Sequence, residues 1–168
     1  LDVSQNTALT VLICGNNQLT SLDVSQNTAL HGFQCQNNGL SSLDVSYNTT
    51  LVYLDCASNQ LTNLDVTNNI AVFNLQCHYN DLTSLDVSNN TALALLYCHY
   101  NQLTSLDVRN GNNDSLNFIC ATNPNLTCID VDDASWSTAH WTFANGNIDL
   151  QHYFSNNCSG TAIEEQDS

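Results

Sequence analysis

Positive charge is almost absent from the sequence. It contains no lysine and a single arginine, Arg109, against 16 acidic residues, which gives a formal net charge of −15. Nucleic acids and anionic membrane surfaces are bound through cationic side chains, so both are poor partners for this chain. The charge also exceeds the roughly 2 to 8 that is usual for a small soluble domain. Such a surface fits salty or divalent-rich water, where self-repulsion is screened.

Long hydrophobic runs and glycine-rich loops are also missing. No run of about 18 apolar residues occurs, so we expect no membrane insertion, and the six scattered glycines form no loop that could cradle a phosphate. No signal peptide is visible, and the sequence opens inside a repeat at Leu1, so we interpret it as a mature or trimmed fragment. At 168 residues it is large enough for one domain with its own core.

What the sequence does contain is a strict repeat. The pattern LDVSxNTALxxLxCxxNxLTS recurs with a period of 21 residues, the last time in degraded form. Its copies begin at Leu1, Leu22, Leu43, Leu64, Leu85 and Leu106. A fixed period in this range indicates that each copy is one coil of a solenoid and that stacked coils share a continuous core. Apolar residues alternate with variable ones in each copy, which predicts one short strand per coil in a parallel sheet.

The repeat carries a resemblance to a known family. The motif Leu9-x-x-Leu12-x-Cys14-x-x-Asn17-x-Leu19 resembles the leucine-rich repeat, with cysteine at the third apolar position. The 21-residue length and the return segment Leu-Asp-Val-Ser are similar to secreted bacterial leucine-rich-repeat proteins of the internalin-like class. The resemblance covers about residues 1 to 130. It implies a curved, right-handed solenoid with a parallel β-sheet on its concave face, and a binding or adhesion role rather than catalysis.

Three parts follow from where the repeat holds. Residues 1 to 128 contain the six repeat copies. Residues 129 to 158 lose the period but are rich in aromatic and aliphatic side chains, so we expect a cap over the core of the last coil. A short helix at about Ala134–His140, with an aspartate near its N-terminus, is predicted within this cap. Residues 159 to 168 are polar and acidic and are predicted to form a tail.

The eight cysteines fall into two groups. Six share one position of the repeat and are expected to stack inside the core as a ladder: Cys14, Cys35, Cys56, Cys77, Cys98 and Cys120. In-register neighbours aim their Cβ atoms parallel to each other, so we do not expect disulfides along this ladder, and a straight row does not form the tetrahedron that structural zinc needs. Cys128 and Cys158 lie off the ladder and bracket the cap, and we predict that they form a disulfide.

Two polar columns also repeat. The asparagine after each strand, as in Asn17, is expected to be buried and to hydrogen-bond the backbone of neighbouring coils. Aspartates form the second column, on the return side of each coil: Asp2, Asp23, Asp44, Asp65, Asp86, Asp107 and Asp130. Like charges at this spacing repel, and we favour hydrogen bonds from nearby N–H, Ser or Thr groups as the compensation. The alternative is weak calcium binding, without a calcium-loop signature, at Asp23, Asp44, Asp65 and Asp86.

Residues that vary from coil to coil are the candidates for function, because the scaffold does not dictate them. Tyrosine and histidine concentrate at such positions in the third to fifth coils. We predict a ligand-binding patch on the outward face of the sheet, made of Tyr53, Gln76, His78, Tyr79, Tyr97, His99 and Tyr100. Exposed aromatic residues with polar tips dominate binding hot spots and stack on sugar rings. Two alternatives are that the repeated Cys-His-Tyr-Asn segments are copies without a task, or that His78 and His99 share a metal ion.

Catalytic arrangements do not fit this geometry. Cys77–His78 and Cys98–His99 resemble nucleophile–base pairs, yet adjacent strand residues point to opposite faces, so thiol and imidazole do not meet. Asp55 is the only carboxylate among the variable sheet positions, whereas a glycosidase needs two in one cleft.

We therefore predict a non-catalytic recognition or adhesion module, extracellular or at a cell surface, that binds a protein or a carbohydrate on its concave face. The alternative function is a structural or divalent-cation-binding spacer of a cell-surface protein, in which the acidic return side is the working surface. No cofactor is expected beyond the calcium of that alternative.

Overall fold

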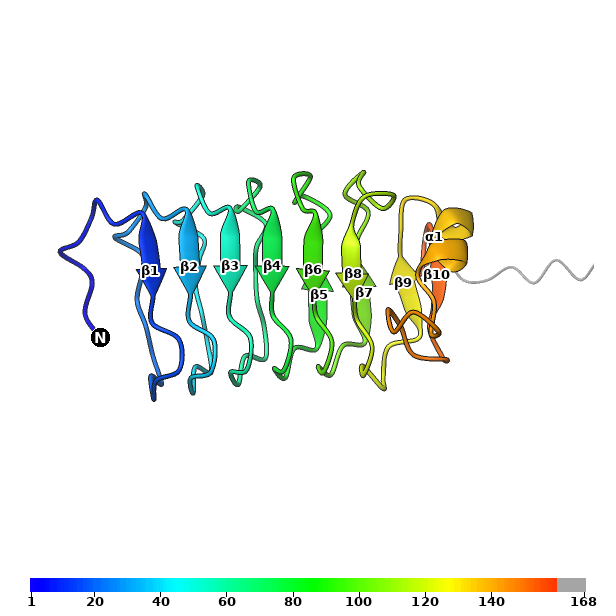
Figure 1. The fold of residues 1–168 in the computed structure, drawn as a ribbon, viewed down its shortest axis with the longest axis horizontal. Coiled ribbons are helices and arrows are strands. Elements are labelled where there is room, and N and C mark those ends of the chain that lie inside the picture. Colours follow the sequence, from blue (N-terminus) through cyan, green and yellow to red (C-terminus); the bar gives the residue numbers. More distant parts are fainter. Residues whose placement is uncertain (160–168) are drawn as a thin grey trace, which may run out of the picture.

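The structure is a computed structural model that describes residues 1–159, which wind into a row of stacked coils (Figure 1). Nearly all of the predicted tail, residues 160–168, lies outside the described residues. One strand from each of six coils joins a parallel sheet with the order β1-β2-β3-β4-β6-β8. These strands are β1 (Val11–Ile13), β2 (Gly32–Gln34), β3 (Tyr53–Asp55), β4 (Asn74–Gln76), β6 (Leu95–Tyr97) and β8 (Asn117–Ile119). The parallel sheet predicted from the repeat is confirmed.

Pairing within this six-stranded sheet follows the repeat residue by residue. Leu54 lies beside Leu75, and Leu75 lies beside Leu96. All three are fully buried. The outward-facing Gln76 and Tyr97 are aligned in the same way. Each repeat position therefore forms a straight column across the sheet, and residues at matching positions of successive coils are neighbours in space.

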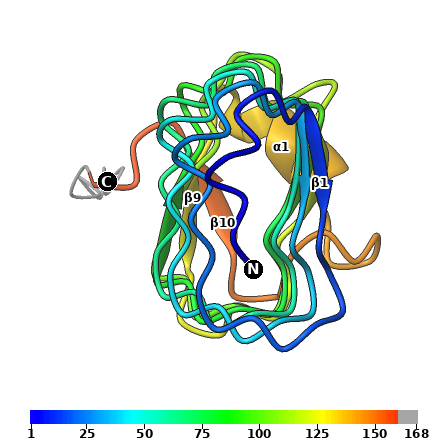
Figure 2. The same ribbon diagram turned by 90° about the vertical axis from the view of Figure 1, so that its left-hand side faces the viewer.

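A second parallel sheet lies on the return side of the coils. It has four strands in the order β10-β9-β7-β5. They are β5 (Ser84–Asp86), β7 (Ser105–Asp107), β9 (Cys128–Asp130) and β10 (Tyr153–Ser155). Figure 2, viewed along the row, shows a flattened ring with β1 on one side and β9 and β10 on the other. The prediction of a single strand per coil was wrong for these later coils, because their return segments approach closely enough to pair, as between Val87 N–H and the Asp107 carbonyl oxygen at 3.0 Å.

The core lies between the two sides of the ring and is filled by columns of leucine, valine, phenylalanine and cysteine. In the third coil, Leu51, Leu54, Cys56 and Leu61 have no exposed surface. Full burial of one such leucine stabilises the fold by about 2 kcal/mol. All six ladder cysteines are free and buried, and burial raises the pKa of the Cys56 thiol well above its ordinary value. The predicted ladder is confirmed, and its thiols act as apolar packing residues.

Buried asparagines hold the turns after the strands and join neighbouring coils. Asn101 is 1% exposed, and its Oδ1 accepts a hydrogen bond from the backbone N–H of Leu82 at 3.0 Å. Its Nδ2 donates to the carbonyl oxygens of Cys77 at 3.1 Å and Cys98 at 3.0 Å. The equivalent bonds recur in the preceding coils. The structural role predicted for this column is therefore confirmed.

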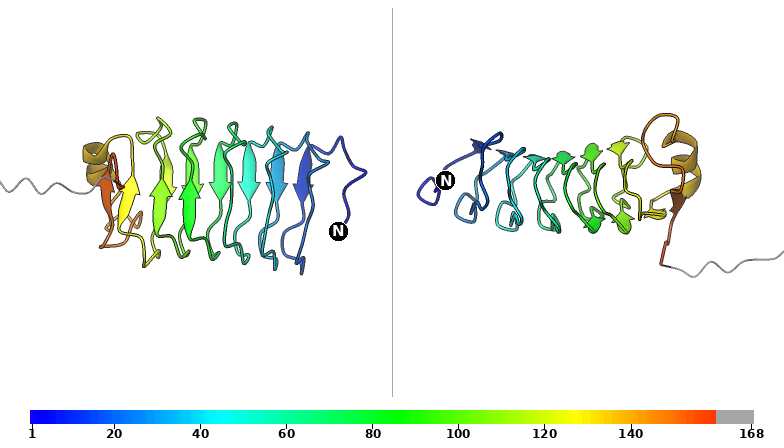
Figure 3. Two further views of the ribbon diagram at one scale, coloured as in Figure 1. Left: turned by 180° about the vertical axis from the view of Figure 1, so that it is seen from behind. Right: turned by 90° about the horizontal axis from the view of Figure 1, so that it is seen from below.

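The cap lies at the end of the row opposite the N-terminus (Figure 3). Its helix α1 (Ala134–His140) starts after Asp133, whose carboxylate accepts a hydrogen bond from the Trp136 backbone N–H at 2.9 Å. Aspartate is a favoured residue at this capping position. Trp141 is 3% exposed and packs on Phe118 of β8, with ring centroids 4.5 Å apart. The expected helix is present, and its flanking tryptophan closes the core of the last coil.

A disulfide and the last strand tie the rest of the cap to the solenoid. Cys128 and Cys158 are bonded, with their sulfur atoms 2.02 Å apart, as predicted. Strand β10 pairs in parallel with β9 and so continues the return-side sheet by one strand. Within residues 1–159, no helix has the length and apolar character needed to cross a lipid bilayer.

Candidate binding surface

All seven residues of the predicted ligand-binding patch come together on the outward side of the six-stranded sheet. Three belong to the strands β3, β4 and β6, and four belong to the turns that follow β4 and β6. We call this set the aromatic patch: Tyr53, Gln76, His78, Tyr79, Tyr97, His99 and Tyr100. Two tyrosines, Tyr79 and Tyr100, are 48% and 46% exposed, and the other five residues are half-buried.

Four rings of the aromatic patch form two stacked pairs that meet edge to face, with planes 64° to 73° apart. The imidazoles of His78 and His99 stack with centroids 4.5 Å apart and planes 10° apart. The phenol rings of Tyr79 and Tyr100 stack at 4.3 Å and 12°. The Tyr79 and His99 rings make an edge contact with centroids 5.7 Å apart, and Tyr97 makes another with His99 at 6.0 Å. The register of the coils thus joins five rings from two segments about 21 residues apart into one contiguous aromatic surface.

Amide side chains border the patch on its strand side. Gln76 Nε2 donates to the hydroxyl of Tyr53 at 3.2 Å and lies 3.3 Å from Asn74 Oδ1. Asn117 Nδ2 donates to the hydroxyl of Tyr97 at 3.4 Å. Asn74 and Asn117 are not part of the patch predicted from the sequence, which rests mainly on aromatic residues. Their outward positions in β4 and β8, beside the tyrosine columns, were the signal that could have found them.

Both histidines of the patch are held in their neutral form. Burial, together with the neighbouring His78, lowers the pKa of His99 to about 4. Burial also lowers the pKa of His78, against the opposing effect of the Asp55 carboxylate. The Nδ1 atoms of both rings are buried without a hydrogen-bond partner, which makes an added proton there unfavourable. At neutral pH the stacked pair therefore carries no charge.

The two tyrosines of the second stack have a left-handed backbone. The same position of six successive coils has φ between 54° and 60°, and its residues are Asn16, Asn37, Ser58, Tyr79, Tyr100 and Thr122. Asparagine tolerates this conformation well, whereas a bulky side chain is strained in it, by about 1 kcal/mol or more. Sequence reasoning did not detect this strain, although the asparagines of the first two coils were a usable signal.

The geometry of His78 and His99 does not suit a shared metal ion or a pairing with the neighbouring cysteines. Stacked parallel imidazoles direct their nitrogen lone pairs side by side and not toward one point, so His78 and His99 do not chelate an ion in this geometry. Among the described residues, 1–159, no group of three or more His, Cys, Asp or Glu side chains could hold a metal ion. Cys77 and Cys98 are fully buried, on the opposite side of the chain from the outward histidines.

Comparison with solved structures places the chain among known repeat proteins. It matches the functional domain of InlJ from Listeria monocytogenes, which is described as including a cysteine ladder, with 36% sequence identity and a TM-score of 0.58. The match covers 78% of this chain and 36% of that chain. The chain is a leucine-rich-repeat protein related to the internalins. Leucine-rich-repeat proteins of this class are generally interaction modules and typically not catalysts.

A second leucine-rich-repeat structure supports the fold alone. The protein LIC12759 of Leptospira interrogans matches with a TM-score of 0.64 and 22% identity, over 78% of this chain and 40% of that chain. The chain therefore spans well under half the length of either relative. A scan against protein-family models finds no match, and a search of curated proteins finds none either.

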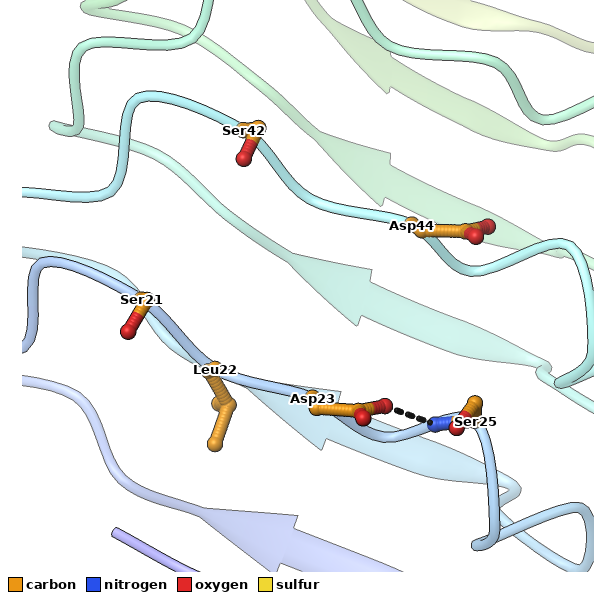
Figure 4. Close-up of a pocket in the computed structure, with 6 residues that line it drawn as sticks. All are labelled: Ser21, Leu22, Asp23, Ser25, Ser42 and Asp44. Carbon is orange, nitrogen blue, oxygen red and sulfur yellow. Dashed lines mark hydrogen bonds between the residues drawn. The ribbon is translucent and has the colours of Figure 1, made fainter.

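The return side of this leucine-rich-repeat chain carries the aspartate column. Six of its seven carboxylates accept a hydrogen bond from the backbone N–H two residues further on, and the seventh, Asp130, accepts one from Cys158 N–H in the cap. Asp23 Oδ1 accepts from the backbone N–H of Ser25 at 2.8 Å (Figure 4), and the same bond recurs through Asp2, Asp44, Asp65 and Asp86. This hydrogen bond lowers the pKa of the Asp23 carboxyl. Asp23 and Asp44 also line a shallow hollow of about 450 Å³ together with Ser21 and Ser42. The hydrogen bonds expected for the column are present.

Arg109, the sole arginine, lies at the far end of this column. Its guanidinium pairs with Asp107 and lies 3.8 Å from Asp130 of the next coil. Its NH1 group also donates to the carbonyl oxygen of Asn156 in the cap, at 3.1 Å. The sequence's one guanidinium is therefore engaged on the return side, and the six-stranded sheet faces solvent without a lysine or arginine.

Proposed function

We propose that this leucine-rich-repeat chain is a secreted or cell-surface recognition module that binds a protein or a carbohydrate on the aromatic patch, without catalysing a reaction. The observation that carries the proposal is the left-handed backbone of Tyr79 and Tyr100. At this position the fold favours asparagine, which the first two coils have. Tyrosine at this position adds backbone strain to the folded state, and strain of this kind is concentrated at functional sites in proteins.

The chemistry of the patch suits contact with a ligand. Tyr79 and Tyr100 expose about half of their surface, and their hydroxyl groups let them accept a partner that is partly polar. Tyrosines contribute large, rigid contact areas at little entropic cost and are enriched among binding hot spots. The neutral histidine stack in edge contact with them adds apolar surface and no charge that would have to be desolvated.

Two observations support an extracellular location. Disulfides such as Cys128–Cys158 form and persist in oxidising compartments. The relationship to the internalins points to a bacterial surface or secreted protein.

The proposal is tested by finding ligands with a glycan array and a panel of purified surface proteins, and then comparing variants. Tyr79→Asn combined with Tyr100→Asn removes both rings and restores the residue that the backbone favours. Tyr47→Asn, which removes a tyrosine that is 59% exposed outside the patch, is the matched control. We expect the affinity for a captured ligand to fall at least about tenfold in the double variant, equivalent to about 1.4 kcal/mol. Equal affinities for wild type, double variant and control would refute the proposal.

The return side favours a second candidate function, a spacer that binds divalent cations. Asp23 and Asp44 face one hollow together with serine hydroxyls, and calcium takes six to eight oxygen ligands that include carboxylates and water. A cation that binds only the native state raises its stability. The melting temperature at low ionic strength should then rise with calcium in the wild type but not in the variant Asp23→Asn with Asp44→Asn. If the melting temperature is the same with calcium and with chelator, the spacer function is ruled out.

A further inference from the structure

We propose that the recognition surface continues from the aromatic patch across the cap, and that it takes a protein segment in which arginine or lysine lies beside an apolar side chain. The inference rests on the proposed function and names the chemistry of its partner. It starts from the way in which the cap joins the last coil.

The cap loop takes the place of one more coil beside β8. Within the solenoid, the turn N–H groups of Tyr100 and Asn101 donate to carbonyl oxygens of the following coil, at 3.1 and 3.3 Å. One coil later, the corresponding N–H groups of Thr122 and Asn123 donate to the two carboxylate oxygens of Asp149, at 2.9 and 3.1 Å. Asp149 thus stands in for the missing coil, and the turn edge that carries Tyr79 and Tyr100 runs into the cap without a break.

Next to Asp149 the cap exposes two large apolar side chains. Leu150 is 79% exposed and Phe143 is 57% exposed. With Pro124 and Thr122 they line a shallow hollow of about 380 Å³. Closing the solenoid core does not require either of them, because other cap residues, such as Trp141 at 3% exposure, already cover it. Neighbouring exposed apolar residues of this kind mark interaction sites.

The charge around this surface selects a cationic partner. Asp81, two residues after Tyr79, and Asp149, beside Leu150, place carboxylates along the same turn edge. The sole guanidinium of the chain is engaged on the return side. A partner carboxylate would meet only like charge here, whereas a guanidinium or ammonium group gains from the carboxylates and from the tyrosine faces, a cation–π contact. An apolar side chain next to that cation would fill the cap hollow.

The test measures fluorescence anisotropy with three labelled peptides of equal length. One alternates arginine and leucine, the second alternates arginine and serine, and the third alternates glutamate and leucine. Each is titrated at moderate salt into the wild type and into two variants. The cap variant carries Phe143→Ser and Leu150→Ser. The return-side control carries Asp23→Asn and Asp44→Asn and reports attraction to the acidic column alone.

We expect the arginine–leucine peptide to bind the wild type about tenfold more tightly than the arginine–serine peptide, and the glutamate–leucine peptide not to bind. The cap variant should lower the affinity for the arginine–leucine peptide about tenfold, to the level of the serine peptide. The return-side control should leave it unchanged. The inference is overturned if no peptide binds the wild type, if the cap variant binds as well as the wild type, or if the control variant loses binding.

Failure of this inference differs from failure of the proposed function. One outcome is that a ligand from the glycan array or protein panel loses affinity in the Tyr79 and Tyr100 variant, while the affinity for the arginine–leucine peptide does not change in the Phe143 and Leu150 variant. The aromatic patch is then a recognition surface, and the inferred cationic partner is wrong. A carbohydrate ligand would give this result. If no ligand depends on the two tyrosines, the proposed function itself is wrong.

Discussion

Replacing Asn101 by alanine should destabilise the solenoid far more than the same change in the first coil. The Asn101 side chain is 1% exposed and joins two coils. It accepts from Leu82 N–H at 3.0 Å and donates to the carbonyl oxygens of Cys77 and Cys98 at 3.1 and 3.0 Å. Asn101→Ala removes all of these hydrogen bonds and leaves the backbone groups inside the turn.

The magnitude follows from which of these groups keep a partner. The Leu82 N–H loses its side-chain acceptor, and a buried unsatisfied donor costs about 1 to 3 kcal/mol. The carbonyl oxygens of Cys77 and Cys98 each keep a second donor, Asn80 Nδ2 at 3.1 Å and Asn123 Nδ2 at 3.2 Å. Each of these carbonyls therefore loses only about 0.5 kcal/mol. We expect a total loss of about 2 to 4 kcal/mol in the free energy of unfolding.

Urea unfolding at equilibrium measures this loss, and Asn17→Ala is the matched control. Asn17 occupies the same repeat position in the first coil, but its side chain is exposed. Its Nδ2 donates to the Gly15 carbonyl oxygen in an exposed bond and to the Cys14 carbonyl oxygen, which keeps a second donor in Asn38 Nδ2 at 3.1 Å. We therefore expect a loss below about 1 kcal/mol. If the two variants lose equal stability, or if Asn101→Ala loses less than about 1 kcal/mol, the hydrogen-bond account of the ladder is wrong.

Three further predictions concern the patch and the cap. Burial lowers the pKa of His99 from 6.5 to about 4. The unfolded chain therefore binds the proton first, and the free energy of unfolding should fall as pH drops from about 6.5 towards 4. Urea midpoints measured against pH should fall less in His99→Gln than in the wild type, and identical pH profiles would contradict this. The double variant Tyr79→Asn with Tyr100→Asn should keep the free energy of unfolding within about 1 kcal/mol of the wild type, because relief of the left-handed backbone strain offsets the lost ring stack. A loss above about 3 kcal/mol in the same urea assay would show that the tyrosines have a structural role. Reduction of the Cys128–Cys158 bond, whose cysteines are 30 residues apart, should cost about 3 to 4 kcal/mol; equal urea midpoints with and without reductant would contradict this.

The period of the repeat was enough to place most side chains, because in a solenoid one register decides the direction of every residue in the strand. Once the cysteine column is assigned to the interior, the residue before it must point outward. Tyr97 and Cys98 show this, since the first is half-exposed and the second has no exposed surface. The same logic brought the rings of the aromatic patch together, because matching positions of successive coils lie one strand spacing apart.

Pairings that depend on distances between coils, or that join distant residues where the period has ended, could not be predicted from the sequence. The cap helix and the Cys128–Cys158 disulfide lie in that last part of the chain and could be predicted, because capping residues and cysteine spacing are local signals. The strands β5 and β7 form because return segments of neighbouring coils approach closely enough to exchange backbone hydrogen bonds, as between Val87 N–H and the Asp107 carbonyl at 3.0 Å. The docking of Asp149 under Thr122 joins residues 27 positions apart in a part of the chain where the repeat has already ended. No local pattern encodes such a pairing.

The six buried free thiols make the sensitivity of this protein to oxidation depend on whether it is folded. While the spiral stays wound, each thiol is protonated and out of reach of oxidants. In the unfolded chain the six free thiols are exposed, and if the Cys128–Cys158 disulfide is also broken, all eight cysteines can react. Non-native disulfide pairings then greatly outnumber the single native pairing. Heating in air should therefore be irreversible, whereas heating under acid or a reducing agent should allow the chain to rewind.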